Sequence, residues 1–195
     1  MKPLLVPGTA RFIGFHLAKL LLAEGFIVHG YDGMSDYYDM ALERRRQQML
    51  LQLKGFTATE ALLEDLETLD RSFDDFRPDV IVHLADQARV RHSLENPRTY
   101  LNANVIGTFN AVEAARRLEV DHLLVASTSS VYGATTDMPF VETKRADTRL
   151  TIYAASEKAN ESAAHAPAHL RNLPKTMLQS FYRLWPLGAS GYGAV

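Results

Sequence analysis

The segment Val6–Gly14, VPGTARFIG, joins a short apolar run to an amphipathic stretch and decides how the rest of the chain is interpreted. Gly8, Arg11 and Gly14 occupy the three positions of a G-x-x-G-x-x-G turn, in which backbone N–H groups and a helix N-terminus face a pyrophosphate. An acid that binds a ribose 2′-OH is expected about 20 residues later. Asp32 stands at the end of the next apolar run. This context of strand, turn, helix and acid predicts a dinucleotide-binding unit.

Arg11 stands where such a turn brings the backbone closest to phosphate, and two alternatives are open. In one, the guanidinium bonds phosphate oxygens and compensates for the lost glycine. In the other, the side chain crowds the ligand and the site is lost. A titration with NAD of the wild type beside Arg11→Gly separates them.

Short apolar runs alternate with helical patterns along the chain. We expect strands at 4–6, 26–32, 55–59, 79–84, 122–126 and 176–181, and helices at 12–24, 39–53, 66–76, 97–118 and 152–170. This alternation predicts an α/β fold with a doubly wound parallel sheet of the Rossmann type, covered on both faces. We expect one domain over residues 1–183 and a short remnant or frayed tail over 184–195.

Composition narrows the class of protein. Of the 195 residues, 47% are hydrophobic and 23% charged, as in soluble globular proteins. A net charge of −2 gives no reason to expect nucleic acid or an anionic membrane as partner. The absence of cysteine excludes disulfides and thiolate metal sites. No signal peptide is recognised and no apolar run approaches the ~18 residues of a membrane span, so we expect a cytoplasmic protein.

Two basic features are expected to lie on the surface. His165 and His169 are four residues apart, as helical metal ligands can be, but no acid is suitably spaced and we expect no metal site. Arg44, Arg45 and Arg46 belong to a helix rich in Glu and Gln, and we expect them to form a solvated face.

Two further segments carry hydroxyl groups suited to chemistry: STSSVYG at 127–133 and YAASEK at 153–158. Together with GTARFIG, YDGMSDYYD, HLADQARVRHSLENP and NVIGT, they resemble the extended short-chain dehydrogenase/reductase family, in particular nucleotide-sugar epimerases of the UDP-glucuronate 4-epimerase type. The resemblance covers nearly the whole chain. Dehydratase relatives carry an Asp-Glu pair where Ser129 and Ser130 stand here, which favours an epimerase.

The resemblance implies a bound NAD, a nucleotide-sugar substrate such as a UDP-sugar, and a role in polysaccharide biosynthesis. A tyrosinate takes the proton of the sugar 4-OH while hydride passes from C4 to the nicotinamide, and hydride then returns to the other face of the rotated ketone. By motif position Tyr153 is the base and Thr128 bonds the same sugar oxygen. The resemblance also implies a homodimer formed through helices 97–118 and 152–170.

The resemblance also implies which residues hold the cofactor. Asp32 would bind the adenosine ribose, Asp65 and Leu66 the adenine, and Asn104 would support the region after strand 79–84. The full set of implied cofactor-binding residues is Gly8, Arg11, Phe12, Ile13, Gly14, Asp32, Asp65, Leu66, Leu84 and Asn104.

The catalytic motif departs from the family at one position. A free tyrosine has a pKa near ~10 and is a poor base at neutral pH. The family places a lysine four residues on, one helical turn from the tyrosine, and here that position holds Glu157. Lys158 remains a candidate, although five residues turn it about 140° from Tyr153 on an ideal helix. A carboxylate at 157 raises the pKa of the phenol, so the sign of the required effect is reversed.

Other departures point the same way. Asp86 and Arg89 replace small residues after strand 79–84, Pro7 replaces a threonine, and Leu184 stands where relatives have a tyrosine. Pro167, inside a predicted helix, removes a hydrogen bond and costs ~3 kcal/mol or kinks the helix. Relatives continue into a further segment that builds the nucleotide-sugar site, so we expect the substrate domain to be mostly missing.

Several functions are therefore open. Thr128 could be only a polar exit from a strand and Tyr153 only a residue at a helix start, although the VYG that follows Ser130 favours the motif. The first hypothesis is an NAD-dependent nucleotide-sugar epimerase by family, with impaired catalysis; the second is a non-catalytic dinucleotide-binding or partner-binding remnant; the third is a damaged fragment. Copurified NAD separates the first two from the third. Conversion of UDP-glucuronate to UDP-galacturonate separates the first from the second, and we expect no measurable turnover.

Overall fold

The structure is a computed structural model that describes residues 2–35, 39–88, 90–133, 140–141, 151–171 and 173–180. The side chains of Val90, residues 166–171 and Ser180 lie outside this description. So do Arg89, Leu184 and the predicted tail 184–195.

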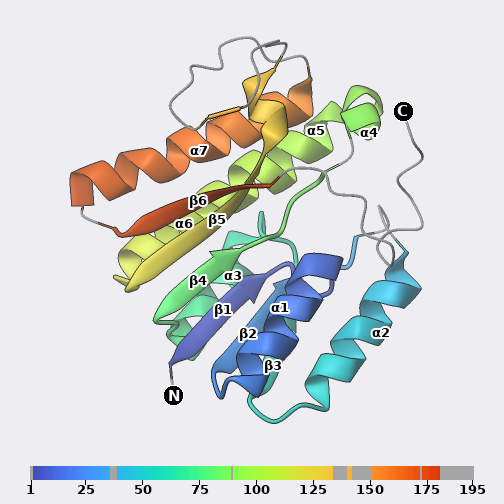
Figure 1. The fold of residues 1–195 in the computed structure, drawn as a ribbon, viewed down its shortest axis with the longest axis vertical. Helices are drawn as coiled ribbons and strands as arrows, with labels where there is room; N and C mark the ends of the chain where they lie inside the picture. Colours follow the sequence, from blue (N-terminus) through green and yellow to red (C-terminus); the bar gives the residue numbers. More distant parts are fainter. Residues whose placement is uncertain are drawn as a thin grey trace.

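The described strands form one parallel sheet in the order β3-β2-β1-β4-β5-β6 (Figure 1). This order reverses direction between β1 and β4, which is the topological switch of a doubly wound fold. The predicted Rossmann-type sheet is thereby confirmed. The strands are β1 (Pro3–Pro7), β2 (Ile27–Asp32), β3 (Phe56–Glu60), β4 (Val80–His83), β5 (His122–Thr128) and β6 (Lys175–Ser180).

Helices cover both faces of the sheet. On one face α1 packs beside α2, and on the other α6 packs against both α3 and α7, an arrangement that Figure 1 also shows. The helices are α1 (Phe12–Ala23), α2 (Met40–Leu51), α3 (Leu66–Phe76), α4 (Val90–Glu95), α5 (Pro97–Tyr100), the π-helix η1 (Leu101–Ile106), α6 (Gly107–Arg117), the 3₁₀-helix η2 (Ser129–Tyr132) and α7 (Ile152–Arg171). None of the helices in the described part of the chain is long and apolar enough to cross a membrane.

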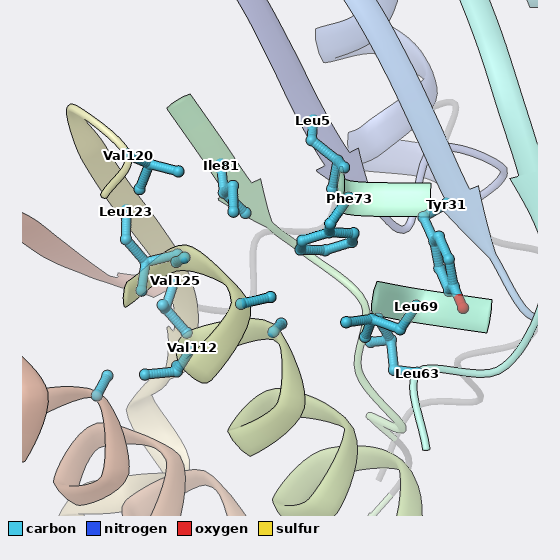
Figure 2. Packing of buried hydrophobic residues seen from close by; sticks show 14 of the residues in the cluster. Leu5, Tyr31, Leu63, Leu69, Phe73, Ile81, Val112, Val120, Leu123 and Val125 are labelled. Carbon is cyan, nitrogen blue, oxygen red and sulfur yellow. The ribbon is translucent and has the colours of Figure 1, made fainter. Parts of the chain in front are cut away.

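Successive side chains of the strands point to opposite faces and build two cores. Leu5 of β1 belongs to the core under α3 and α6, where Phe73 and Val112 also lie (Figure 2). The next residue, Val6, belongs to the core under α1 and α2. Since a strand has a period of two residues, the continuous apolar run that marked β1 in the sequence is what a strand buried on both sides requires.

The starts of the helices differ in a way that matters for function. Asp39 caps α2 by accepting from the N–H groups of Ala41 and Leu42, and Asp65 caps α3 by accepting from the N–H of Thr68 at 3.2 Å. The N-cap of α1 is Arg11, whose side chain makes no capping hydrogen bond. The first-turn N–H groups of α1 are therefore not capped by that side chain, and they lie at the carboxyl ends of the strands.

One helical prediction was wrong and another was confirmed. The single helix expected over 97–118 is divided into α5, η1 and α6, and a short helix, α4, precedes it. The π-helix adds a residue to the turn just before Gly107, where a Cβ would come within 2.8 Å of the Cβ of Leu63. The helix predicted over 152–170 is present as α7, which continues past Pro167 to Arg171.

Candidate functional site

The turn between β1 and α1 leaves no room for side chains at its two glycines. Gly8 has a φ of +96°, and a Cβ there would lie 2.9 Å from the backbone N of Ala85. A Cβ at Gly14 would lie 2.1 Å from the carbonyl oxygen of Gly8. The turn is closed by a hydrogen bond from the N–H of Arg11 to that same oxygen, at 3.2 Å. The glycine spacing therefore serves the close packing of strand against helix that a dinucleotide-binding turn needs.

Asp32 ties this turn to the end of β2. Its Oδ2 accepts from the N–H of Ala10 at 3.1 Å, and its Oδ1 accepts from the N–H of Met34 at 3.2 Å. Burial raises the pKa of Asp32, while Arg11 and the two N–H donors oppose that change. Each carboxylate oxygen retains accepting capacity, so Asp32 could still receive a ligand hydroxyl.

Arg11 is held on the α2 side of the turn. Its Nε lies 2.9 Å from Oε1 of Glu43, and a terminal nitrogen donates to Oγ of Ser35 at 3.2 Å. Glu43 is only 1% exposed, and burial raises its pKa to about 7 although Arg11 opposes the rise. The guanidinium is thus anchored by a buried acid of α2, and both alternatives for its effect on a ligand stay open.

The three consecutive arginines of α2 do not share one environment. Arg44 pairs with Glu60 at 3.0 Å, and both side chains are exposed as predicted. Arg46 instead donates to the carbonyl oxygen of Ala10 at 3.3 Å and lies over the ring of Phe12. The prediction of a uniformly solvated face was wrong for Arg46, because α2 turns this residue toward the turn before α1.

An open cavity lies at the carboxyl ends of β1, β2 and β4, where parallel sheets bind ligands. It reaches from Asp32 past Gly8 and Arg11 to Asp86. Its lining residues are Gly8, Arg11, Tyr31, Asp32, Gly33, Ser35, Leu62, Leu63, Glu64, Ala85, Asp86, Gln87 and Ala103.

The cavity wall after β3 comes from Leu62, Leu63 and Glu64. Asp65 and Leu66, predicted to contact adenine, are exposed and do not line the cavity. The physical reason is that Asp65 is committed to capping α3. Leu62 and Leu63, rather than Asp65 and Leu66, therefore form this part of the cavity wall.

The other implied cofactor residues lie around the cavity rather than in its wall. Leu84 presents its carbonyl group to Gly8, and Ile13 is 63% exposed on α1. Asn104, fully buried in η1, accepts from the N–H of Gln87 at 2.9 Å and donates to the carbonyl of Gln87 at 3.2 Å. Asn104 thus fixes the backbone that follows β4, which is the supporting position implied by the resemblance.

The candidate catalytic hydroxyls lie on neighbouring elements. Tyr153, in the first turn of α7, is 6% exposed and its ring meets that of Tyr100 edge to face at 6.2 Å. Thr128 ends β5 and accepts from the N–H of Ser130 at 3.2 Å. Since α7 packs against both β5 and η2, the fold brings these two segments together.

Glu157 and Asp86 form a buried carboxyl pair beside Tyr153. Glu157 is 2% exposed and accepts from Nδ2 of Asn104 at 3.5 Å. Burial, followed by the nearby Asp86, raises the pKa of Glu157 well above its usual range. Burial also raises the pKa of Asp86 to about 6, and hydrogen bonding to Glu157 and Tyr153 opposes that rise. The two adjacent carboxyl groups therefore resist ionising together, and the strong rise at Glu157 favours a pair in which Asp86 carries the first negative charge.

The carboxyl pair and the position of Lys158 both bear on the charge predicted beside Tyr153. The sequence predicted an anion at Glu157, whereas burial and the adjacent Asp86 raise the pKa of Glu157 and favour its neutral form. Nζ of Lys158 lies 2.9 Å from Oε2 of Glu161, and Oε1 of Glu161 accepts from Oγ of Ser127 at 2.8 Å. The ammonium of Lys158 is therefore paired on a different side of α7.

Sequence reasoning missed two features of this site. Glu43 could not be found because its partner, Arg11, is distant in the sequence and the charge pattern of α2 resembles a solvated face. Asp86 is recognisable from the sequence as a departure from the family, but its contact with Glu157 is not. The sequence signal for this pair is that Asp86 and Glu157 are both acids, at positions where the family has an alanine and a lysine.

The chain matches the family model described as GDP-mannose 4,6 dehydratase over residues 5–186. It is 49% identical to a probable UDP-glucuronate 4-epimerase of Rhizobium meliloti (strain 1021), over 94% of this chain and 54% of that protein. It is 44% identical to the protein CapI of Staphylococcus aureus, over 95% of this chain and 55% of that protein.

Solved structures of nucleotide-sugar epimerases are also similar to this chain. The UDP-glucuronic acid 4-epimerase of Bacillus cereus, solved with UDP-glucuronic acid and NAD, has a TM-score of 0.82 at 27% identity, over 91% of this chain and 55% of that one. The UDP-glucose 4-epimerase of Thermus thermophilus, solved with NAD, has a TM-score of 0.79 at 31% identity, over 91% and 54%. The chain spans about half the length of these proteins.

The family model covers most of the chain, and the motifs that carried the resemblance lie within it. The chain belongs to the GDP-mannose 4,6-dehydratase family of extended short-chain dehydrogenases/reductases.

Proposed function

We propose that this chain binds NAD in the cavity at the ends of β1, β2 and β4. The observation that carries the proposal is the turn at Gly8 and Gly14, which has no room for a Cβ and leads into a helix not capped by its N-cap side chain. A helix start of this kind binds anions such as a pyrophosphate. Asp32 would bind the adenosine ribose, and Leu62 and Leu63 would contact the adenine.

The residues present fit the cofactor at this end. Asp32 is anchored by two backbone N–H groups and keeps lone pairs for a hydroxyl. The relatives solved with NAD share this fold over nearly the whole chain. Arg11 lines the same cavity, and its pairing with Glu43 draws the guanidinium toward α2.

The proposed activity of the whole protein is the C4 epimerisation of a UDP-sugar of the glucuronate type. NAD would supply the acceptor that takes and returns a hydride. Tyr153 would exchange a proton with the sugar hydroxyl and Thr128 would hydrogen-bond the same oxygen. The 49% identity to a probable UDP-glucuronate 4-epimerase supports this substrate class. With this activity we also propose a role in polysaccharide biosynthesis and a cytoplasmic location.

We further propose that this chain by itself is impaired in catalysis. Lys158 pairs with Glu161, and the carboxyl pair places a negative charge beside Tyr153, where the family has an ammonium. Tyr153 thus loses the cation that would make it a better base. The alternative function, a non-catalytic dinucleotide-binding or partner-binding protein, is favoured by the same observation.

Mass and absorbance analysis of the purified protein tests the binding proposal, followed by calorimetric titration with NAD. We expect saturable binding of one NAD per chain. Arg11→Gly shows which effect of the guanidinium dominates, and Arg44→Ala is its control, since it removes an equal charge from the exposed face of α2. A folded wild type that takes up no NAD contradicts the proposal.

Turnover separates the two functions once binding is established. We expect no conversion of UDP-glucuronate to UDP-galacturonate by this chain. Robust conversion would overturn the proposed impairment and exclude the non-catalytic alternative.

We also propose a homodimer through helices 97–118 and 152–170. Leu101, Ile106 and Phe109 are each about half exposed on this part of the molecule, although they are large and apolar. Light scattering should give twice the mass of the chain, and Phe109→Glu should halve it. A wild type that is monomeric at high concentration contradicts the dimer.

A further inference from the structure

The cavity has two ends of different chemistry. Asp32 and Ser35 line one end and Asp86 and Gln87 the other, with Gly8 between them. If the adenosine ribose lies at Asp32 and the pyrophosphate at the turn, the rest of a dinucleotide extends past Gly8 toward Asp86. This inference rests on the proposed NAD site.

The far end carries the carboxyl pair, Asp86 and Glu157. Asn104 holds the residue next to each acid in the sequence. Its Nδ2 donates to the carbonyl of Gln87, which follows Asp86, at 3.2 Å, and to Oγ of Ser156, which precedes Glu157, at 3.1 Å. The same nitrogen lies 3.5 Å from Oε1 of Glu157. Oδ1 of Asp86 is a buried atom without a hydrogen-bond partner among the described residues. One negative charge is thus fixed in the cavity wall with little solvation, where a cation would be stabilised.

Several charged groups surround this pair. Arg11 favours the charged form of Asp86 from the turn, and Glu161 on α7 disfavours ionisation of Glu157. Lys158 is bound to Glu161. Arg89, three residues after Asp86 in the sequence, lies outside the described residues. Tyr153 is the other titratable neighbour, and its side chain hydrogen-bonds to Asp86.

The two redox forms of NAD differ only in the nicotinamide ring. The oxidised ring is a pyridinium cation and the reduced ring is neutral, whereas the adenosine and pyrophosphate parts are the same. Charges near Asp32 and Glu43 therefore act about equally on both forms. A charge at the Asp86 end acts on the pyridinium and leaves the neutral ring almost unaffected.

We propose that the carboxyl pair Asp86–Glu157 makes this cavity selective for the oxidised, pyridinium form of the dinucleotide over the reduced form. An ammonium at position 157 would have the opposite effect, because it repels the same ring. The substitution of an acid for the family lysine thus changes which cofactor form the chain holds.

The test is a pair of calorimetric titrations, one with NAD⁺ and one with NADH, on each protein at pH 7.5. We expect the ratio of the two dissociation constants in the wild type to favour NAD⁺ by about tenfold more than in Asp86→Asn. Glu157→Lys should shift the ratio toward NADH. Glu43→Gln is the matched control: it also removes a buried carboxyl near Arg11, but at the other end, so the ratio should stay that of the wild type.

Two further measurements test whether the charge of Asp86, rather than its shape, causes the preference for NAD⁺. Glu157→Gln should keep the wild-type ratio, since Glu157 is neutral and Asp86 remains charged. In the wild type the preference should fade below pH 6, where Asp86 takes up a proton, and this fading should be absent in Asp86→Asn. Thermal unfolding confirms that each variant is folded.

The outcomes separate this inference from the proposed function. Equal ratios in the wild type and Asp86→Asn, with both nucleotides binding, overturn the selectivity and leave the NAD site intact. Binding of neither nucleotide to the folded wild type overturns the NAD site and the selectivity with it.

Discussion

The turn at Gly8–Gly14 lines the cavity, whereas the first turns of α7 reach it only through Asp86, which contacts Glu157 and Tyr153. The two regions differ in how they meet the requirements of the family. At the turn, both glycines pack closely and Asp32 is held by backbone hydrogen bonds. Arg11, which replaces a glycine of the family, forms an ion pair with the buried Glu43 of α2. At α7 the family tyrosine is present as Tyr153, but carboxyl groups stand beside it where the family has an ammonium. The comparison teaches that binding and catalysis depend on separate sets of residues in this fold. One set can therefore change while the other is retained.

The largest effect is expected at Gly14. A Cβ there lies 2.1 Å from a backbone oxygen that cannot move without opening the turn. Gly14→Ala should lower the free energy of unfolding by about 3 kcal/mol and abolish NAD binding. Urea unfolding measures the loss. Gly25→Ala is the control: its φ of +85° makes alanine unfavourable, but nothing lies within 4 Å, so stability should fall while NAD binding persists.

Arg11 should show a smaller, pH-dependent effect. Arg11→Ala leaves Glu43 buried without its ion-pair partner. At pH 8 we expect the free energy of unfolding to fall by about 2 kcal/mol. At pH 6 the loss should shrink, because burial raises the pKa of Glu43 to about 7 and the acid is then mostly neutral with or without Arg11. Urea unfolding at both pH values checks this. A loss that is the same at pH 6 and pH 8 would show that the ion pair is not its source.

Asp86 should make the folded state less stable as pH rises. Its pKa in the folded protein is raised to about 6, so the folded state gains a proton before the unfolded chain does as pH falls. The associated stability is complete below pH 4 and is lost as pH rises through 6, by about 1–2 kcal/mol after allowance for partial exposure. His29 and His83, whose pKa values are lowered by burial, act in the opposite direction in this range.

The variant Asp86→Asn isolates this contribution, since both histidines remain. The difference in unfolding free energy between wild type and variant should change in favour of the variant between pH 4 and pH 7. A difference that does not vary with pH would contradict the buried carboxyl pair.

The smallest effect is expected at Lys158. Its ammonium is partly exposed and paired with Glu161, so Lys158→Ala should change the unfolding free energy by no more than about 0.5 kcal/mol. It should also leave the NAD⁺ to NADH preference unchanged. A change in that preference would place the ammonium of Lys158 in the cavity and restore part of the family mechanism.

Much of the fold was predictable because its signals are local. The apolar runs at β1, β4 and β5 and the amphipathic stretches between them predict a parallel sheet, and the glycines with Asp32 locate the cavity. The π-helix could not be predicted, because the sequence Leu101–Ile106 has an ordinary helical pattern.

The site was less predictable where it depends on contacts between distant residues. The position of Asp65 after β3 suggests an adenine contact, but its side chain caps α3 and Leu62 and Leu63 line the cavity. Likewise, the sequence indicates an acid beside Tyr153 but cannot show that Asp86 contacts that acid. Such pairing is decided by the folded geometry between β4 and α7.

The central claim is that an intact glycine turn still seats a dinucleotide along the cavity that ends at the carboxyl pair. Amide chemical shifts of the ¹⁵N-labelled wild type, followed during titration with NAD⁺, test it most directly. We expect the resonances of residues 8–14 and of 85–87 to move together and saturate at one NAD⁺ per chain. A well-folded spectrum in which those of the turn do not move, even at high NAD⁺ concentration, would contradict it.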